Sequence, residues 1–251
     1  MIRNLTEGPP LRLLFFFALP MVAGNLFQQL YNMVDSMVVG KFVGEDALAA
    51  VGSSFPIVFL AVAVASGLSM GCTVVISQLF GAGKIREMKT TVATALIALG
   101  VLGAAIMVLG QLAAPLLLHL LGTDADIMAD SLAYLQIYFG GALFLFLYNT
   151  LNGIYNALGD SKTPLYFLMV SALGNIGLDL LFVIQFHMGV AGVAWATLIA
   201  QGVCAVASFW VLAVRLRMMP NEQPCQKLPL FSWDAVRRIA RIGLPDRKSV
   251  V

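Results

Sequence analysis

The amino-acid sequence predicts an all-α polytopic membrane protein, a bundle of six transmembrane helices, and three observations support this fold class. The 251 residues are 60% hydrophobic and only 11% charged, whereas soluble domains average about 45–50% apolar and about 25% charged residues. The chain contains apolar stretches that are each long enough to cross the roughly 30 Å hydrocarbon core of a bilayer as a helix. The alternating segments of roughly 10 residues that build a transmembrane barrel do not occur in the sequence.

Short loops rich in glycine, proline and charge separate the apolar stretches, which are residues 13–39, 48–79, 91–118, 129–158, 164–186 and 189–214. The first stretch lacks a small-residue cleavage site and is longer than the apolar region of a signal peptide, so we expect it to be retained. As a helix it would reach about 40 Å, so it must tilt, bend or protrude. Every loop offers helix breakers: Gly40 and Gly44, Gly81 and Gly83, Gly122, Gly159 and Pro164, and Gly189.

The distribution of basic residues predicts the orientation of the bundle. Lysine and arginine gather on one side of the predicted membrane: Arg3, Arg12, Lys84, Arg86, Lys89, Lys162, Arg215, Arg217, Lys227, Arg237, Arg238 and Arg241. The opposite loops carry Lys41 among the acids Glu45, Asp46, Asp124, Asp126 and Asp130. By the positive-inside rule, residues 1–12 and the segment after residue 217 are predicted to be cytoplasmic, in a protein of the cytoplasmic membrane.

The segment 218–245 differs in character from the six spans at 13–217. Residues 231–244 set apolar side chains against Arg237, Arg238 and Arg241, which is typical of an amphipathic helix at a membrane interface. The sequence Ile242-Gly243-Leu244-Pro245 is similar to Phe17-Ala18-Leu19-Pro20, as at the start of a second six-span unit, and such repeats are common in transporters. Residues 246–251 resemble the translation of an adapter oligonucleotide, so we expect an artefactual tail on a truncated half of a longer protein.

The polar residues inside the spans are the candidates for function, because an aspartate at the centre of a membrane helix costs about 2.5–3.5 kcal/mol. Two charged residues, Asp35 and Asp179, fall inside the spans. Other polar residues form stripes at helical spacing: Asn25, Gln28, Gln29, Asn32 and Ser36; Asn149, Asn152 and Asn156; Ser171, Asn175 and Asp179; and Thr197, Gln201, Cys204 and Ser208. Four polar stripes on apolar helices predict a shared interior cavity.

Each stripe also has a simpler interpretation, since hydroxyl and amide side chains in membrane helices often only bond a neighbouring helix. Asp35 lies nearer the outer end of its span and could be interfacial, whereas Asp179 lies deep in the bundle without a cationic partner in any span. Pro20 removes a helical hydrogen bond in the first span, so it is either an inert kink or a hinge.

Several classes of function are excluded by composition. The net charge of +2, spread over short loops, argues against a nucleic-acid partner. Cys72, Cys204 and Cys225 show neither a disulfide pattern nor metal-ligand spacing, so we expect no metal cofactor.

Four motifs occur in order along the chain: Ala18-Leu19-Pro20 with Asp35 and Gly40, Leu48-Ala49-Ala50, Gln78-Leu79-Phe80-Gly81-Ala82-Gly83, and the turn Gly159-Asp160-Ser161-Lys162-Thr163-Pro164. Through these motifs the sequence resembles the multidrug and toxic compound extrusion (MATE) transporters from Leu13 to Pro245. The resemblance implies that the chain is the N-terminal six-helix lobe of a twelve-helix, two-lobe transporter and that the C-terminal lobe is missing.

Carried over position by position, the resemblance implies a cation-linked site at Asp35, Asn149, Asn152, Asn175, Asp179 and Thr197, and a bend in the first helix at Pro20. We therefore expect an antiporter, not an enzyme, that exports organic cations or drugs. The coupling ion would be H⁺, or Na⁺ at Asp35, Asn175 and Asp179, and no other cofactor is expected. Expected partners are small organic cations, the lipid bilayer and the missing lobe.

Two alternatives belong to other classes. A flippase for lipid-linked saccharides would share the helix count but would need a cationic cavity, and the spans contain neither lysine nor arginine. An intramembrane aspartyl protease would need Y-D and G-x-G-D signatures, which do not occur around Asp35 and Asp179.

Overall fold

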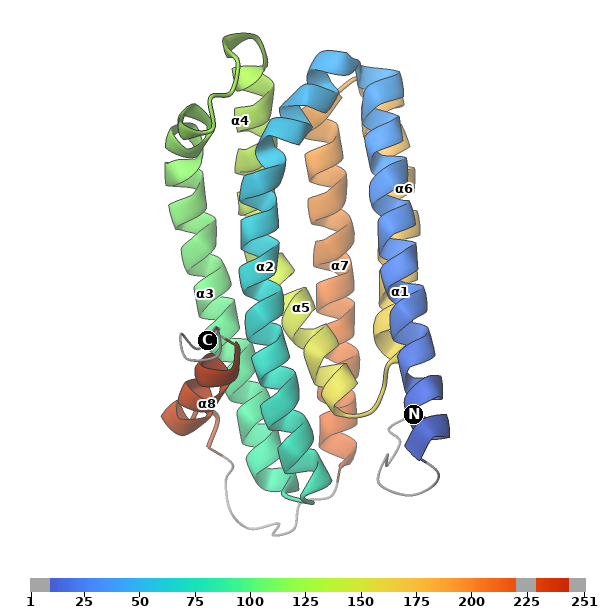
Figure 1. The fold of residues 1–251 in the computed structure, drawn as a ribbon, viewed down its shortest axis with the longest axis vertical. Helices are drawn as coiled ribbons and strands as arrows, with labels where there is room; N and C mark the ends of the chain where they lie inside the picture. Colours follow the sequence, from blue (N-terminus) through green and yellow to red (C-terminus); the bar gives the residue numbers. More distant parts are fainter. Residues whose placement is uncertain (1–9, 220–228, 244–251) are drawn as a thin grey trace.

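The structure of the chain is a computed structural model that describes residues 10–219 and 229–243, without the side chains of residues 10–14, 16 and 17. All regular elements within these residues are helices, and the long ones run side by side in an elongated bundle (Figure 1). The all-α bundle predicted from the sequence is therefore confirmed. Residues 1–9 of the predicted N-terminal segment, 220–228 of the predicted linker and the predicted artefactual tail 246–251 lie outside the described residues.

The elements follow in the order α1 (Pro10–Val38), η1 (Val39–Val43), α2 (Glu45–Gly81), α3 (Ile85–Leu120), α4 (Ala125–Gly140), α5 (Ala142–Ala157), α6 (Lys162–Leu180), η2 (Leu181–Gln185), α7 (Gly189–Met218) and α8 (Trp233–Gly243). The short elements η1 and η2 are π-helical continuations of α1 and α6. Tight turns join the long helices at the predicted breakers; Gly83 and Gly159, with φ of 73° and 75°, adopt the left-handed conformation that favours glycine.

Among the described residues, four helices are long and apolar enough to cross a membrane, namely α2, α3, α6 with η2, and α7, and the bent pair α4 and α5 is a candidate fifth span. Helix α1, the first predicted span, is not among them, and the side chains of residues 10–14, 16 and 17 at its apolar start lie outside the described residues. The chain is nevertheless multi-pass, and α1 runs alongside α6 as a rod of the same bundle (Figure 1).

The fourth predicted span, 129–158, is not one straight helix. It breaks at Gly140 and Gly141 into α4 and α5, which are inclined by 51°. A pair of glycines lowers the cost of leaving the helical path, and α3 approaches this span closely through its own glycines. A Cβ at Gly103 would lie 3.0 Å from the Cβ of Phe146, and one at Gly110 would overlap the Phe139 ring.

The loops define two ends of the bundle. The basic end is where α2 meets α3, where α5 meets α6 and where α7 finishes, with Lys84, Lys162 and Arg217. The acidic end is opposite, with Glu45, Asp46 and Asp124 at the starts of α2 and α4. The largest apolar core lies toward the basic end, around Ile76, Met88, Leu99, Phe146 and Tyr155 of α2, α3 and α5.

Helix α1 lies at the edge of the bundle and packs mainly against α6. One of its faces is left open, with the exposed side chains Leu26, Leu30, Met33 and Met37. An element held on one side only is easier to displace than one packed on all sides, because few buried contacts resist its motion.

Candidate functional site

Two carboxyl groups from separate helices meet inside the bundle. Asp35 comes from the last turns of α1 and Asp179 from the end of α6, and the two side chains lie close enough to interact electrostatically. Asp179 is fully buried, with 0% of its surface exposed. Each residue has a buried Oδ1 atom for which no hydrogen-bond partner lies among the residues that the structure describes. Such unpartnered buried acceptors are costly.

Asn175 and Thr197 complete one side of the carboxyl pair. With its amide oriented so that both ends are satisfied, Asn175 donates to Asp179 Oδ2 at 2.9 Å. Its oxygen then accepts from the Thr197 hydroxyl at 3.2 Å and the Thr197 backbone N–H at 3.0 Å. Asn175 stands one turn before Asp179 on α6, so helical spacing places both on one face, which α7 covers with Thr197.

The ends of α1 and α6 share a feature beside the two acids. Both helices widen into π-helical turns a few residues after the aspartate, at Val39 in η1 and at Leu181 in η2. Short π-helical segments often occur at functional sites because they redirect the side chains around them. The two aspartates thus stand just ahead of the places where their helices depart from regular geometry.

Tyrosines lie near the carboxyl pair, and the sequence analysis did not single them out. Tyr31 and Tyr134 lie close enough to Asp35 and Asp179 to interact with both electrostatically. Tyr134 stacks on Tyr138, with ring centroids 6.3 Å apart. Spacing was an available signal for Tyr31, which lies one turn before Asp35 on α1, whereas Tyr134 and Tyr138 reach the site only through the packing of α4 against α7.

A small cavity beside the carboxyl pair lies between α1, α5, α6 and α7, with a volume of about 30 Å³. Its lining consists of Gln28, Tyr31, Tyr148, Leu168, Ser171, Ala172, Asn175, Thr197, Ala200 and Gln201. None of these side chains is a lysine or arginine, and two are aromatic rings. A volume of about 30 Å³ has room for a water molecule or an ion and is well below the roughly 300–1,000 Å³ of small-molecule sites.

The polar stripes meet this cavity only in part. Gln28, Thr197 and Gln201 line it, but the structure places Asn25, Gln29, Asn32 and Ser36 of α1 at the exposed surface. The stripe on α1 is therefore split, because at 3.6 residues per turn Gln28 and Asp35 lie about 60–80° around the helix from the row of Asn25, Gln29, Asn32 and Ser36. One part faces inward with Asp35, and the other faces out of the bundle.

The structure places Asn149 away from the cavity. It belongs to the contact between α5 and α2, where the Ser66 hydroxyl donates to its side-chain oxygen at 3.3 Å and Ser69 donates to its backbone carbonyl at 2.6 Å. This contact is close because Gly153, one turn further along α5, lies against Ser69 and Thr73. In this structure Asn149 therefore contributes to the packing of α5 against α2, which is the simpler interpretation of a polar stripe.

Asn152 and Pro20 also lie outside the cavity lining. Asn152 stands one turn after Tyr148 on α5, with a buried Oδ1 that has no hydrogen-bond partner. Pro20 lies within α1, which continues through it from Pro10 to Val38.

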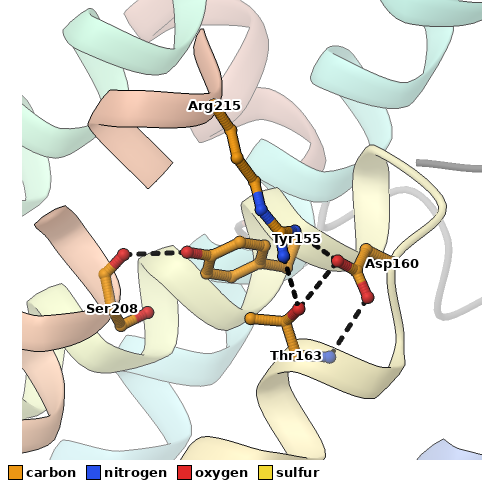
Figure 2. Close-up of polar contacts among 5 residues, drawn as sticks. All are labelled: Tyr155, Asp160, Thr163, Ser208 and Arg215. Atoms are coloured by element: carbon orange, nitrogen blue, oxygen red, sulfur yellow. Dashed lines mark hydrogen bonds and ion pairs between the residues drawn. The ribbon is translucent and has the colours of Figure 1, made fainter. Parts of the chain in front are cut away.

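A second buried polar cluster lies at the basic end, where the turn between α5 and α6 meets α7 (Figure 2). The Arg215 guanidinium forms an ion pair with Asp160 and donates to the Thr163 hydroxyl at 3.1 Å. Asp160 also accepts from the Thr163 backbone N–H at 3.1 Å and from its hydroxyl at 2.7 Å. Arg215 covers the ring of Tyr155, whose hydroxyl donates to the Ser208 carbonyl at 2.8 Å.

This cluster accounts for the motif Gly159-Asp160-Ser161-Lys162-Thr163-Pro164. Burial acts to raise the pKa of Asp160, but the hydrogen bonds from Thr163 and from Arg215 outweigh it and hold the pKa below its usual value. Asp160 is thus a stable carboxylate that links α5, α6 and α7, unlike the carboxyl pair deeper in the bundle.

The fold and the buried acids define a multi-pass membrane protein with a polar cavity in its interior. The family model MatE matches residues 20–181, more than half of the chain. The chain therefore belongs to the MATE family, whose members are transporters.

Individual relatives agree with this assignment. The "Probable multidrug resistance protein YpnP" of Bacillus subtilis is 32% identical over 242 residues, which cover 96% of this chain and 53% of that protein. A solved structure described as MATE in the straight conformation matches with a TM-score of 0.85 and 28% identity over 95% of this chain and 53% of that one. MATE in the bent conformation matches with a TM-score of 0.79, 28% identity and coverage of 94% and 52%. The chain spans about half the length of these relatives.

Proposed function

We propose that this chain forms the ion-binding half of an antiporter that exports organic cations in exchange for H⁺ or Na⁺. The observation that carries the proposal is the proximity of Asp35 and Asp179 inside the bundle. Asn175 covers one side of the pair, and a polar cavity lies beside it. The multidrug-resistance name of the Bacillus relative supports the same kind of cargo.

Two carboxyl groups that lie close together act as a binding site for one positive charge. Both cannot remain ionised at such close range unless a proton or a cation lies between them, because their repulsion in a poorly solvated interior is too strong. Oxygen donors from carboxyl and amide groups suit Na⁺ as well as H⁺. Binding of the ion removes the repulsion that would otherwise separate α1 from α6, so occupancy of the site is linked to the position of α1.

The side chains that line the cavity favour positive over negative charge. It has no lysine or arginine in its lining, and the faces of Tyr31 and Tyr148 can attract a cation through their electron-rich rings. A pyrophosphate-linked saccharide would need cationic side chains here, so the cavity disfavours the flippase alternative.

The available energy is sufficient for such exchange. One charge that crosses a membrane potential of 100 mV releases about 2.3 kcal/mol, which at 1.4 kcal/mol per tenfold sustains a concentration ratio of about 40. The ion and the cargo must prefer different conformations of the protein, because otherwise neither could drive the other.

The open face of α1 indicates where the missing half would lie. Asn25, Gln29 and Asn32 are exposed on this helix, and uncovered amide groups are expensive in lipid. We therefore place this face toward a water-filled passage between two lobes rather than toward acyl chains.

The test is ion-coupled efflux by the full-length protein, with the chain joined to a second six-helix half, in inverted membrane vesicles. A fluorescent organic cation should accumulate under an imposed H⁺ or Na⁺ gradient, and each gradient applied separately identifies the coupling ion. Asp179→Asn should abolish gradient-driven uptake with normal membrane insertion, since it keeps the shape but removes the titratable group. Asp46→Asn, at an exposed acid, is the matched control and should retain uptake. Undiminished gradient-dependent uptake by Asp179→Asn would refute the assignment.

A further inference from the structure

The docking of α8 fixes which way this helix faces. It lies along α2 and α3, well away from the turn that joins them (Figure 1). Ala235 and Ile239 are buried in this contact. The two backbones approach through glycines: a Cβ at Gly71 would lie 2.5 Å from the Ile239 carbonyl oxygen, and one at Gly243 would lie 2.9 Å from the Gly67 carbonyl oxygen. Such proximity permits little rotation of α8 about its axis.

The start of α8 is fixed as well. The Ser232 backbone N–H donates to the Thr94 hydroxyl of α3 at 3.0 Å, and the Ser232 hydroxyl caps the helix by accepting from the Ala235 N–H at 3.4 Å. With one end bonded to α3 and its length set against α2, α8 presents a defined outer surface.

Three arginines occupy that outer surface. Arg237 and Arg241 lie one turn apart on the side opposite Ile239, and Arg238 lies beside them; we call these three residues the arginine face. All three are exposed, and in the part of the chain that the structure describes none of them forms an ion pair with a carboxylate. The face carries three positive charges, and with Asp234 as its one acid the helix as a whole has an excess of two.

The depth of α8 along α2 matches the boundary of a bilayer. The 37 residues of α2 reach about 55 Å, roughly 25 Å more than the hydrocarbon core, so about 12 Å protrudes at each end if the excess is shared equally. Gly71 precedes the end of α2 at Gly81 by ten residues, a distance of about 15 Å. The contact between α8 and α2 therefore lies near the level of the lipid headgroups.

Aromatic side chains at the start of α8 agree with this depth. Trp233 is 70% exposed, and its ring meets that of Phe231 edge to face with centroids 5.2 Å apart. Tryptophan is enriched at the membrane interface, where its ring sits at the level of the headgroups.

We propose that the arginine face of α8 binds the headgroups of anionic phospholipids in the leaflet at the basic end of the bundle. A guanidinium group binds phosphate through two parallel hydrogen bonds. Each basic residue held at an anionic membrane surface strengthens binding to that surface by about fivefold. An apolar helix of a neighbouring protein is a poor occupant, because it would bury three unpaired charges. The proposal rests on α8 and its docking on α2 and α3, and it is independent of the transport activity.

The test uses Trp233 as a native reporter in the whole chain. Trp195→Phe and Trp210→Phe leave it as the sole tryptophan, and the protein is placed in nanodiscs of phosphatidylcholine and phosphatidylglycerol at 3:1. In one sample a quarter of all lipid is phosphatidylglycerol with brominated acyl chains, and in the other a quarter is brominated phosphatidylcholine. We expect severalfold stronger quenching of Trp233 by brominated phosphatidylglycerol, with the excess reduced in high salt.

Two variants decide whether the charges are responsible. Replacing Arg237, Arg238 and Arg241 together with glutamine should abolish the excess quenching, whereas Asp234→Asn, the matched control that retains the arginines, should preserve or increase it. A protein with Trp195 as its sole tryptophan, near the acidic end of α7, should show no preference between the lipids. Equal quenching of Trp233 by both lipids, no quenching by either, or an excess that survives loss of the arginines would overturn the proposal.

Discussion

Asp160 differs from Asp35 and Asp179 in what surrounds it. Its carboxylate is 2% exposed but receives two hydrogen bonds from Thr163 and the charge of Arg215, whereas the other two acids face each other. One arrangement favours a permanent charge and the other a titratable pair. Three aspartates of the same chain, two of them buried and one half-buried, thus acquire different chemistry from their neighbours alone.

The first prediction concerns the ion pair between Asp160 and Arg215. Arg215→Gln leaves a buried carboxylate without its cation, so we expect the free energy of unfolding to fall by about 3 kcal/mol, the lower end for a buried pair. The measurement is denaturant unfolding of the chain in detergent. Arg217→Gln, two residues further along α7, is the control, and an equal loss in both variants would contradict a specific role for Arg215.

The acid dependence of stability follows from the lowered pKa of Asp160. A carboxyl group whose folded pKa lies below its unfolded value of about 3.9 contributes full stability above that pH and loses it as the pH falls through the folded pKa. We therefore expect a steeper loss of the thermal midpoint below about pH 4 in the parent chain than in Asp160→Asn. If the thermal midpoints of the two proteins fell equally below about pH 4, Asp160 would not contribute to the pH dependence of stability.

At the scale of elements, glycines decide which helices approach closely. Gly71→Leu should displace α8, because a Cβ alone would lie 2.5 Å from the Ile239 carbonyl oxygen. We expect a cost of about 1–3 kcal/mol and faster amide hydrogen exchange over residues 233–243. Gly52→Ala on the same helix is the matched control, since no atom lies within 4 Å of its Cβ position. Unchanged exchange in Gly71→Leu would mean that α8 does not depend on this contact.

The interior proline of α1 is a second feature at this scale. Pro20 removes one backbone donor from a helix that is packed mainly on one side, so Pro20→Ala restores a hydrogen bond and stiffens α1. In the full-length protein we expect slower gradient-driven efflux with unchanged membrane insertion. Pro115→Ala in α3 tests for a general effect of interior prolines. Turnover at the parent rate in Pro20→Ala would make Pro20 a passive kink.

The sequence predicted which polar residues form stripes on the helices, but it did not predict the direction in which each stripe faces. Helical spacing placed Asn175 with Asp179 and Thr197 with Gln201, and these residues do meet at the carboxyl pair and its cavity. Spacing also placed Asn149 in line with Asn152, yet Asn149 lies against α2. Periodicity fixes which residues share a helical face, but the rotation of each helix depends on its packing partners.

At the scale of the whole molecule, the two exposed surfaces of the bundle should meet different solvents. Asn32 on α1 and Leu112 on α3 are both exposed, the latter by 76%. We expect water between the lobes at Asn32 and lipid at Leu112. The test introduces a single cysteine at each position of the full-length protein, with the native cysteines replaced by serine, and measures labelling by a hydrophilic thiol reagent in proteoliposomes.

Asn32→Cys should be labelled at least about tenfold faster than Leu112→Cys, because the thiolate reacts and forms only where water is present. Equal rates at the two positions would mean that the α1 face is covered by lipid or by tightly packed protein. That outcome would remove the support that this face gives to a two-lobed arrangement.

Composition and hydropathy alone determined that the chain is an all-α membrane bundle, where its helices begin and end to within a few residues, and that Asp35 and Asp179 are exceptional. These features follow from the cost of placing polar groups in lipid, which is local to each segment. Tertiary structure alone decided that the two carboxyl groups lie close together, that Tyr31 and Tyr134 lie near them, that the fourth span breaks at Gly140 and that α8 docks on α2. Each of these depends on contacts between residues distant in the chain, and such contacts are set by how complementary surfaces pack rather than by any single helix.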